Sequence, residues 1–283
     1  MDVVVIGDTA KDINIFKGRT QKGSYEKDTK VVNNGGACFY SSVGASIFCN
    51  CGVVTKIGED FDINNYRKFG IDVTGVSTVK GKTTRFFQTF LSKDGQEREF
   101  RAERNPGTKI SIQDIPLEYL NNAKYIFLST TLPENQLQLI KDIRKISNAK
   151  IAVDTLKEFS EQPVTRQVYD NADIAFIDRE FETLINSKAK TKIIKYGKVG
   201  CLYLAENNQC IFNNKRVIPD SEVIDKTGAG DVLIGSFLAV LSRTNNPQIA
   251  LEKANATATE SILQYGVENL KERIRMREDV EKW

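Results

Sequence analysis

Short apolar runs rich in β-branched residues recur along this chain, and they constrain its fold more than any other feature. The first is Val3 to Ile6, which ends at Gly7. Continuous apolar runs of this length are typical of strands that are buried on both faces of a parallel sheet. Comparable runs follow at residues 52–58, 125–129, 150–154, 174–177 and 192–197.

Helical patterns lie between these runs. Residues 134–147, with Pro133 at their start, and residues 180–186 have the spacing and start signals of helices. Strands that alternate with helices across short polar joints predict an α/β fold, with a doubly wound, mostly parallel sheet flanked by helices. Ligands of such sheets bind beyond the carboxyl ends of the strands. Since no repeat or linker divides the sequence, we expect a single domain over residues 1–283.

One segment, residues 82–104, breaks this pattern. Its residues alternate in polarity on both sides of a polar turn at 93–96, which predicts a β-hairpin. Together with the polar segment 14–32, the hairpin would form a small accessory sheet. We expect that sheet to act as a lid over the ligand or as a surface where two subunits pair. An ordinary edge hairpin is the alternative.

Charge and hydropathy exclude several classes of partner. The 283 residues include 40 basic and 37 acidic side chains, a net charge of +3. So balanced a chain has no electrostatic reason to bind nucleic acid, whereas a small-molecule substrate is compatible with it. No run approaches the roughly 18–20 apolar residues that a membrane helix needs, and no signal segment is evident. We therefore expect a cytoplasmic protein with neither a nucleic-acid nor a membrane partner.

The chain has no histidine, which limits its chemistry. Acid–base steps must fall to Asp, Glu, Lys, Tyr or Cys. The five cysteines are an odd number without a C-x-x-C pair. We expect them to be reduced and mostly structural, without a zinc site.

A glycine-rich turn stands late in the chain, at residues 225–231. Gly228 and Gly230 flank Ala229, Asp231 follows, and an apolar helical run begins at Val232. Such a turn lets several backbone N–H groups converge at the positive end of a helix, which suits a phosphate group. Taken alone, Asp231 would be a helix cap. A catalytic role for Asp231 accounts for the glycines on both sides of Ala229, whereas a role as a helix cap does not.

A glycine pair, Gly35-Gly36, precedes a run of small residues suited to close packing. Together with residues 7–12 and the 225–231 turn, the pair resembles the ribokinase-like (PfkB) family of sugar and nucleoside kinases. The resemblance spans nearly the whole chain, and the turn is its most specific part. It implies an ATP-dependent, Mg²⁺-requiring kinase that transfers the γ-phosphate to a hydroxyl of a sugar or polyol.

The resemblance also assigns roles to residues. Asp231 matches the catalytic base, and Gly228, Ala229 and Gly230 match the anion hole that stabilises the transferred phosphoryl group. Candidates for binding the acceptor substrate are Asp12, Asn34, Gly35, Gly36 and Arg85.

Further residues match the nucleotide and metal sites of the family. The nucleotide-binding candidates are Lys195, Gly197, Gly200, Thr227 and Asn255. Glu182 resembles the glutamate that organises Mg²⁺ through water. Asp225, with Thr227, occupies a position that holds a monovalent cation such as K⁺ in some members.

Three departures from the ribokinase pattern affect the substrate. An asparagine after the glycine pair is replaced by Tyr40 or Ser41, depending on the alignment. The phosphate-side asparagine is Arg179, and a threonine or serine before the nucleotide turn is Lys195. These changes argue against ribose, and we hypothesise that Arg179 and Lys195 contact phosphate. Residues 35–42 and 84–86 look more like the inositol kinase branch.

Other functions remain open. In a nucleoside kinase of the same fold, Phe86, Phe87 and Phe90 would stack on a base, although they would equally serve as lid core. A non-catalytic nucleotide- or sugar-binding protein is a second alternative. A dehydrogenase fits less well, because Gly7 opens no G-x-G-x-x-G fingerprint. We expect a monomer, or a homodimer formed through the lid.

Overall fold

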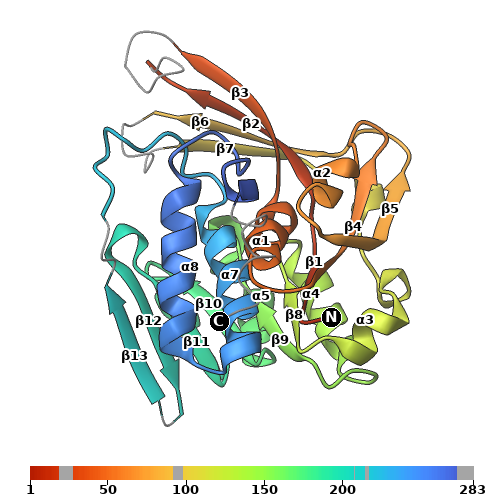
Figure 1. Cartoon of the computed structure of the whole chain (residues 1–283). Helices are drawn as coiled ribbons and strands as arrows, with labels where there is room; N and C mark the ends of the chain where they lie inside the picture. Colours follow the sequence, from red (N-terminus) through yellow and green to blue (C-terminus); the bar gives the residue numbers. More distant parts are fainter. Residues whose placement is uncertain (19–27, 92–97, 207, 214–216, 273–283) are drawn as a thin grey trace.

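Two sheets organise the chain in the computed structural model, which describes residues 1–18, 28–91, 98–206, 208–213 and 217–272 (Figure 1). The strands of the large sheet are β1 (Val3–Ile6), β4 (Cys51–Gly58), β5 (Asp72–Val79), β8 (Tyr125–Leu128), β9 (Lys150–Val153), β10 (Ile174–Asp178), β11 (Thr191–Lys195), β12 (Gly200–Ala205) and β13 (Asn208–Asn213). Their order is β13-β12-β11-β10-β9-β8-β1-β4-β5. All neighbouring strands run parallel except at β12, which pairs antiparallel with β11 and with β13.

Helices cover both faces of the large sheet. One face carries α1 (Ala37–Ser46), α2 (Asn64–Arg67), α7 (Ala229–Thr244) and α8 (Pro247–Ser261); the other carries α3 (Leu117–Asn122), α4 (Pro133–Ile143), α5 (Pro163–Asp170) and α6 (Glu182–Ile185). Short 3₁₀ turns cover Pro106–Thr108, Ile112–Asp114, Lys157–Phe159 and Gly197–Val199.

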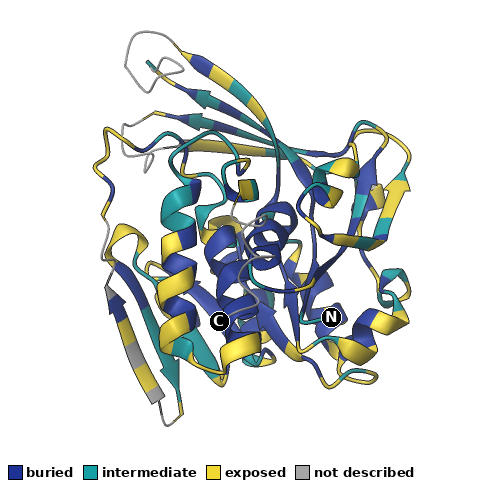
Figure 2. Cartoon of the chain, viewed as in Figure 1, coloured by how far each residue is buried: buried dark blue, intermediate teal, exposed yellow. Residues whose placement is uncertain are grey.

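Strand β1 shows why the sequence folds this way. Its side chains alternate between the two faces, so that Val3 and Val5 join the core under α1 and α7, while Val4 and Ile6 join the core under α3 to α5. Strand β1 and most of α1 and α7 are buried (Figure 2). The prediction of a doubly wound, mostly parallel sheet is confirmed.

The small sheet contains β2 (Ala10–Phe16), β3 (Thr29–Gly35), β6 (Thr84–Phe90) and β7 (Arg98–Glu103), in the order β3-β2-β6-β7. Strands β6 and β7 pair antiparallel, which confirms the hairpin. The predicted turn at 93–96 lies outside the described residues, as does most of the loop within 14–32. Because β2 follows directly after β1, the small sheet begins at the carboxyl end of the large one (Figure 1).

The small sheet has two distinct faces. On β2, Asp12, Asn14 and Phe16 are buried, whereas the residues between them are partly exposed. We call the face of Asp12 the inner face and the opposite one the outer face. In the described part of the chain, no helix is long and apolar enough to cross a membrane. The cysteines Cys38, Cys49, Cys51 and Cys201 are buried and free.

Candidate active site

Three charged side chains meet at the carboxyl ends of β9, β10 and β11. The Nζ of Lys195 donates to Oδ2 of Asp154 at 2.9 Å and lies 3.6 Å from Oδ1 of Asp178. The side chains of Lys195 and Asp154 are only 10% and 8% exposed, while that of Asp178 is 44% exposed. This cluster therefore holds a buried ammonium group at the ligand-binding edge of the sheet.

The glycine-rich turn leads into α7. Gly228 is the N-cap residue, with φ of 76°, and a β-carbon there would lie 2.3 Å from the ring of Tyr40. Only glycine fits both constraints. The first turn of α7 then presents backbone N–H groups that a helix leaves without intrahelical partners, at the positive end of its dipole.

Lys195 lies beside this turn. A β-carbon built on Gly230 would lie 3.9 Å from the Nζ of Lys195. Backbone N–H groups and a buried ammonium group thus flank the same small space. The arrangement suits a group with several negative oxygens, such as a phosphoryl group.

Asp231, in the first turn of α7, is half-buried. Burial, together with the charge of Asp154, raises the pKa of Asp231 to about 7, although Lys195 opposes the shift. A carboxylate with a pKa near neutrality is well suited to take a proton from a hydroxyl at physiological pH.

Asp12 lies on the inner face and is 2% exposed. The hydroxyl of Tyr40 donates to Oδ2 of Asp12 at 2.8 Å. A β-carbon on Gly35 would lie 2.2 Å from that oxygen, so a side chain there would displace the carboxylate. Because the ring of Tyr40 also packs against Gly228, one side chain contacts both Asp12 and the turn before α7.

Asn14 connects the small sheet to the same turn. Its amide donates to Oγ1 of Thr227 at 2.9 Å and to Oδ2 of Asp225 at 3.4 Å. Gln88 of β6 donates in turn to the side-chain oxygen of Asn14 at 3.3 Å. The backbone N–H of Thr227 donates to Asp225, which is 2% exposed.

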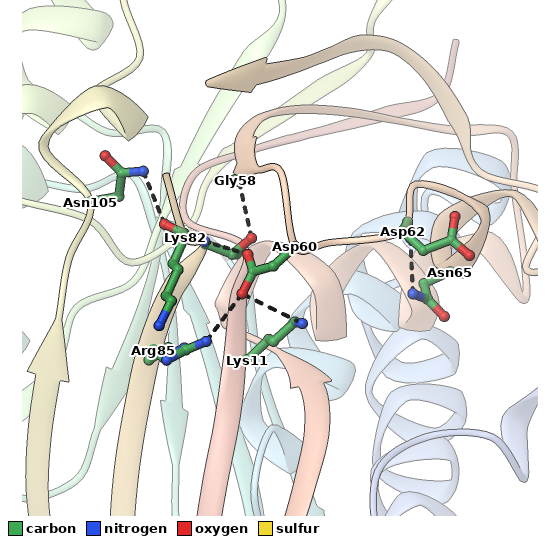
Figure 3. A network of polar contacts seen from close by, with 9 residues as sticks. Lys11, Gly58, Asp60, Asp62, Asn65, Lys82, Arg85 and Asn105 are labelled. Carbon is green, nitrogen blue, oxygen red and sulfur yellow. Dashed lines mark hydrogen bonds and ion pairs between the residues drawn. The ribbon is translucent and has the colours of Figure 1, made fainter. Parts of the chain in front are cut away.

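Two predicted acceptor residues lie away from Asp12. Asn34 and Arg85 are the register partners of Lys11, so they share the outer face. Arg85 contacts Asp60 Oδ2 at 3.2 Å, and Lys11 lies 3.6 Å from the same oxygen (Figure 3). Burial would raise the pKa of Asp60, but hydrogen bonds from Thr83 and the two cations lower it to about 2.

The other predicted nucleotide-side residues are distributed around the cluster. Gly197 and Gly200 bound the turn between β11 and β12. Asn255 is buried on α8; its amide donates to the carbonyl oxygen of Leu251 at 2.8 Å and lies 3.8 Å from Cys201 Sγ.

The acidic and basic residues after β10 are on the surface. Arg179 and Glu182 are exposed, and Glu182 opens α6. Asp178 is the acid of this segment that contacts Lys195.

Sequence reasoning had not assigned a role to Asp154, Asp178 or Asn14. A signal was present for the two acids, because Asp154 ends one predicted strand and Asp178 directly follows another. Polar residues at the carboxyl ends of parallel strands are candidates for ligand contact. The pairing of Asn14 with Thr227 had no local signal.

Comparisons with known proteins show which family and which structures the chain resembles. Residues 1–273 match the pfkB family of carbohydrate kinases. The cytidine kinase of Thermococcus kodakarensis is 29% identical over 266 residues, which cover 86% of this chain and 89% of that protein.

Two solved structures share the fold. The nucleoside kinase of Burkholderia thailandensis in complex with inosine superposes with a TM-score of 0.80, at 14% identity over 99% of each chain. The fructokinase of Xylella fastidiosa with bound ATP superposes with a TM-score of 0.75, at 15% identity over 98% of each chain.

Proposed function

The chain belongs to the pfkB family of carbohydrate kinases, phosphotransferases that act on hydroxyl groups, and from that premise we propose that it transfers the γ-phosphate of ATP to a hydroxyl of a sugar or of the sugar part of a nucleoside. The observation that carries the proposal is that Asp231 and Lys195 both flank the turn at Gly230. Transfer to an alcohol requires a proton acceptor and a phosphate-binding group near the same point.

The side chains divide the reaction between them. Asp12, held by Tyr40, binds hydroxyls of the acceptor, and Asp231 takes the proton from the hydroxyl that attacks. The N–H groups of the turn at residues 228–230 and the ammonium of Lys195 stabilise the negative charge on the transferred phosphoryl group. Asp154 and Asp178 hold Lys195 in position.

ATP would lie along the carboxyl ends of β11 and β12, against the turn at Gly197 and Gly200 and the helix that carries Asn255. Mg²⁺ commonly binds through one or two carboxylates together with phosphate oxygens and water. Asp178, 3.6 Å from the Nζ of Lys195, and Glu182, exposed at the start of α6, are the carboxylates that we propose for this role. When bound, the ion would neutralise charge on the phosphates. A K⁺ ion at Asp225 and Thr227 remains a prediction, and the amide of Asn14 already donates to both side chains.

A nucleoside acceptor is favoured by the 29% identity to the cytidine kinase. The inositol branch remains a prediction from the sequence. A non-catalytic binding role is the remaining alternative, and it predicts that Asp231→Asn leaves any activity unchanged. We also propose that the small sheet acts as the lid of a single domain, with its outer face as the place where a homodimer would form.

The test is Asp231→Asn, assayed for phosphate transfer to a panel of sugars, polyols and nucleosides. We expect kcat to fall by about 10²–10⁴-fold, the usual contribution of a general base. Asp62→Asn makes the same change at an exposed aspartate and is the matched control. Full activity of Asp231→Asn would contradict the proposed role, and no transfer by the native protein to any acceptor would contradict the function.

Thermal melting shows whether the variant is folded. Folding raises the pKa of Asp231 from 3.8 to about 7, so the folded protein binds the proton of Asp231 more tightly than the unfolded chain does. The stability that this protonation contributes is complete below pH 4 and is lost as the pH rises through 7. Asparagine avoids that loss. Asp231→Asn should therefore melt at a higher temperature than the native protein at pH 8, with the difference shrinking toward pH 4.

A further inference from the structure

Gln136, on α4, is a buried glutamine that lies against the carboxyl ends of two strands of the large sheet. The residue is 0% exposed. Its Nε2 donates to the carbonyl oxygens of Leu128 at 3.2 Å, Ser129 at 3.2 Å and Asp154 at 3.1 Å. Since α4 and α7 cover opposite faces of the sheet, Gln136 reaches the strand ends from the layer that does not carry the glycine-rich turn (Figure 1). One side chain thus joins the chain after β8 to the chain after β9.

The carbonyl group of Asp154 lies where the pairing of β9 stops. The last register pair of β8 and β9 is Leu128 with Val153, and the pairing of β9 with β10 also ends at Val153. Asp154 therefore follows the last paired residue of β9 on both sides, yet it is only 5% exposed. The amide of Gln136 continues the link between β8 and β9 beyond the end of their ladder.

Asp154 carries the carboxylate that holds Lys195. Its Oδ2 accepts from the Nζ of Lys195 at 2.9 Å, and a β-carbon on Gly230 would lie 3.9 Å from the same Nζ. Contacts therefore run from Gln136 through the backbone and side chain of Asp154 to Lys195 and the turn before α7. A shift in the backbone of Asp154 would move Lys195 away from the place where we propose that the phosphoryl group binds.

Gln136 differs from its neighbours on α4. Leu137, Leu139 and Ile140 are buried apolar side chains of the core, as expected for a helix that packs on a sheet. The Oε1 of Gln136 is buried and has no hydrogen-bond partner among the described residues, which is unfavourable. An amide is kept at this position in spite of that penalty, and its N–H groups are the part that makes the contacts.

We propose that Gln136 is a positioning residue for phosphate transfer: its amide fixes the backbone of Asp154 and thereby holds Lys195 beside the turn at Gly230. The proposal rests on the proposed kinase function. Because Gln136 is fully buried, it acts through Asp154 and takes no part in binding the acceptor, which we assign to Asp12. Loss of the amide should therefore lower kcat and leave the KM of the acceptor unchanged.

Gln136→Met tests this role, because methionine has a similar length and no N–H donor. With saturating ATP and an acceptor that the panel identifies, kcat should fall by about 10- to 100-fold, since a shift of about 1 Å in a reacting group has effects of up to that size. The KM of the acceptor should change by less than about twofold. Gln138→Met is the matched control, since Gln138 is exposed on the same helix and donates to Asp142 at 2.7 Å. The control should keep the native kcat and KM.

A double-mutant cycle separates positioning from simple stabilisation of the fold. If Gln136 acts through Asp154, adding Gln136→Met to Asp154→Asn should lower kcat by less than about twofold further, because residues that act as a unit are not additive. Independent effects would multiply instead. Thermal melting shows whether each variant is folded. If Gln136→Met does not fold, Gln136→Asn replaces it; its amide is one methylene shorter, so kcat should again fall while the KM of the acceptor stays.

Failure of this role is distinguishable from failure of the proposed function. A native kcat in folded Gln136→Met, a loss that multiplies with that of Asp154→Asn, or a rise in the KM of the acceptor at native kcat would each overturn the positioning role and leave the kinase function standing. Absence of transfer by the native protein to every acceptor of the panel would overturn both.

Discussion

Individual side chains in this protein acquire their chemistry from neighbours that are distant in sequence. Asp231 lies in the first turn of α7, where burial, and after it the charge of Asp154, raises its pKa to about 7. Lys195 stays charged in a buried position because Asp154 and Asp178 surround it; they raise its pKa above the ordinary value, against the effect of burial. Each group is defined by the others, so a change to one should alter the titration of the next.

Asp154→Asn tests this coupling. Removing the negative charge should lower the pKa of Asp231, so the acidic limb of the kcat/KM profile should move to lower pH. At pH 6, activity relative to the plateau should rise by about two- to tenfold, since one pKa unit is a tenfold change in ionisation ratio. Asp142→Asn is the control, because the carboxylate of Asp142 on α4 accepts from Gln138 and Lys145 of the same helical segment and not from Lys195. A limb that stays in place or moves to higher pH would show that Asp154 does not act on the base.

The start of α7 contains two glycines that are required for different reasons. Gly228 has a positive φ and no room for a β-carbon beside Tyr40, so it is required by the backbone and the packing. Gly230 is helical, and the nearest atom to a β-carbon there is Lys195 Nζ at 3.9 Å. Space is kept open at Gly230 although the fold does not need it, which is expected where a substrate approaches the backbone.

Gly228→Ala and Gly230→Ala should therefore fail in different ways. Gly228→Ala should lower the free energy of unfolding by about 1–3 kcal/mol from backbone strain alone, with a further loss from overlap with Tyr40. Gly230→Ala should leave stability within about 1 kcal/mol, because alanine is favoured in helices, yet it should reduce phosphate transfer. Chemical denaturation and activity assays measure the two effects. Equal stability losses would contradict this division.

The whole molecule places the two halves of its candidate site on two different sheets. The large sheet carries Lys195 and its acids, the small sheet carries Asp12, and α7 lies between them. Asn14 joins the small sheet to the turn before α7 through Thr227 and Asp225. The strand that carries Asp12 and the turn before α7 are therefore mechanically connected through Asn14.

Asn14→Ala should weaken that connection. Loss of the donor should cost about 1–3 kcal/mol of stability, as for other buried hydrogen bonds, and should speed amide hydrogen exchange at residues 225–228. Asn34→Ala, on the outer face of the neighbouring strand, should change neither measurement appreciably. If exchange at 225–228 is the same in both variants, the two sheets are not coupled through Asn14.

Local patterns in the chain were sufficient for six strands of the large sheet, the hairpin, the glycine-rich turn and the family, but β5, β12 and β13 were not predicted. Buried strands, tight turns and helix starts depend on residues that are close in sequence, so a pattern of a few residues specifies them. Local patterns did not show which residues of the small sheet lie on its inner face and which on its outer face. Asn34 and Arg85 were assigned to the acceptor, yet strand register pairs both with Lys11 and places them on the outer face, away from Asp12. Register depends on pairing between distant strands.

The same reason applies to the contacts that make the candidate site. Asp154 meets Lys195 across 41 residues, Tyr40 meets Asp12 across 28, and Asn14 meets Thr227 across 213. Such pairs form only when parallel strands end at one edge and α7 packs against α1. The identity of the candidate base could be read from the chain, whereas the partners that set its pKa and shape its acceptor pocket were decided by tertiary packing.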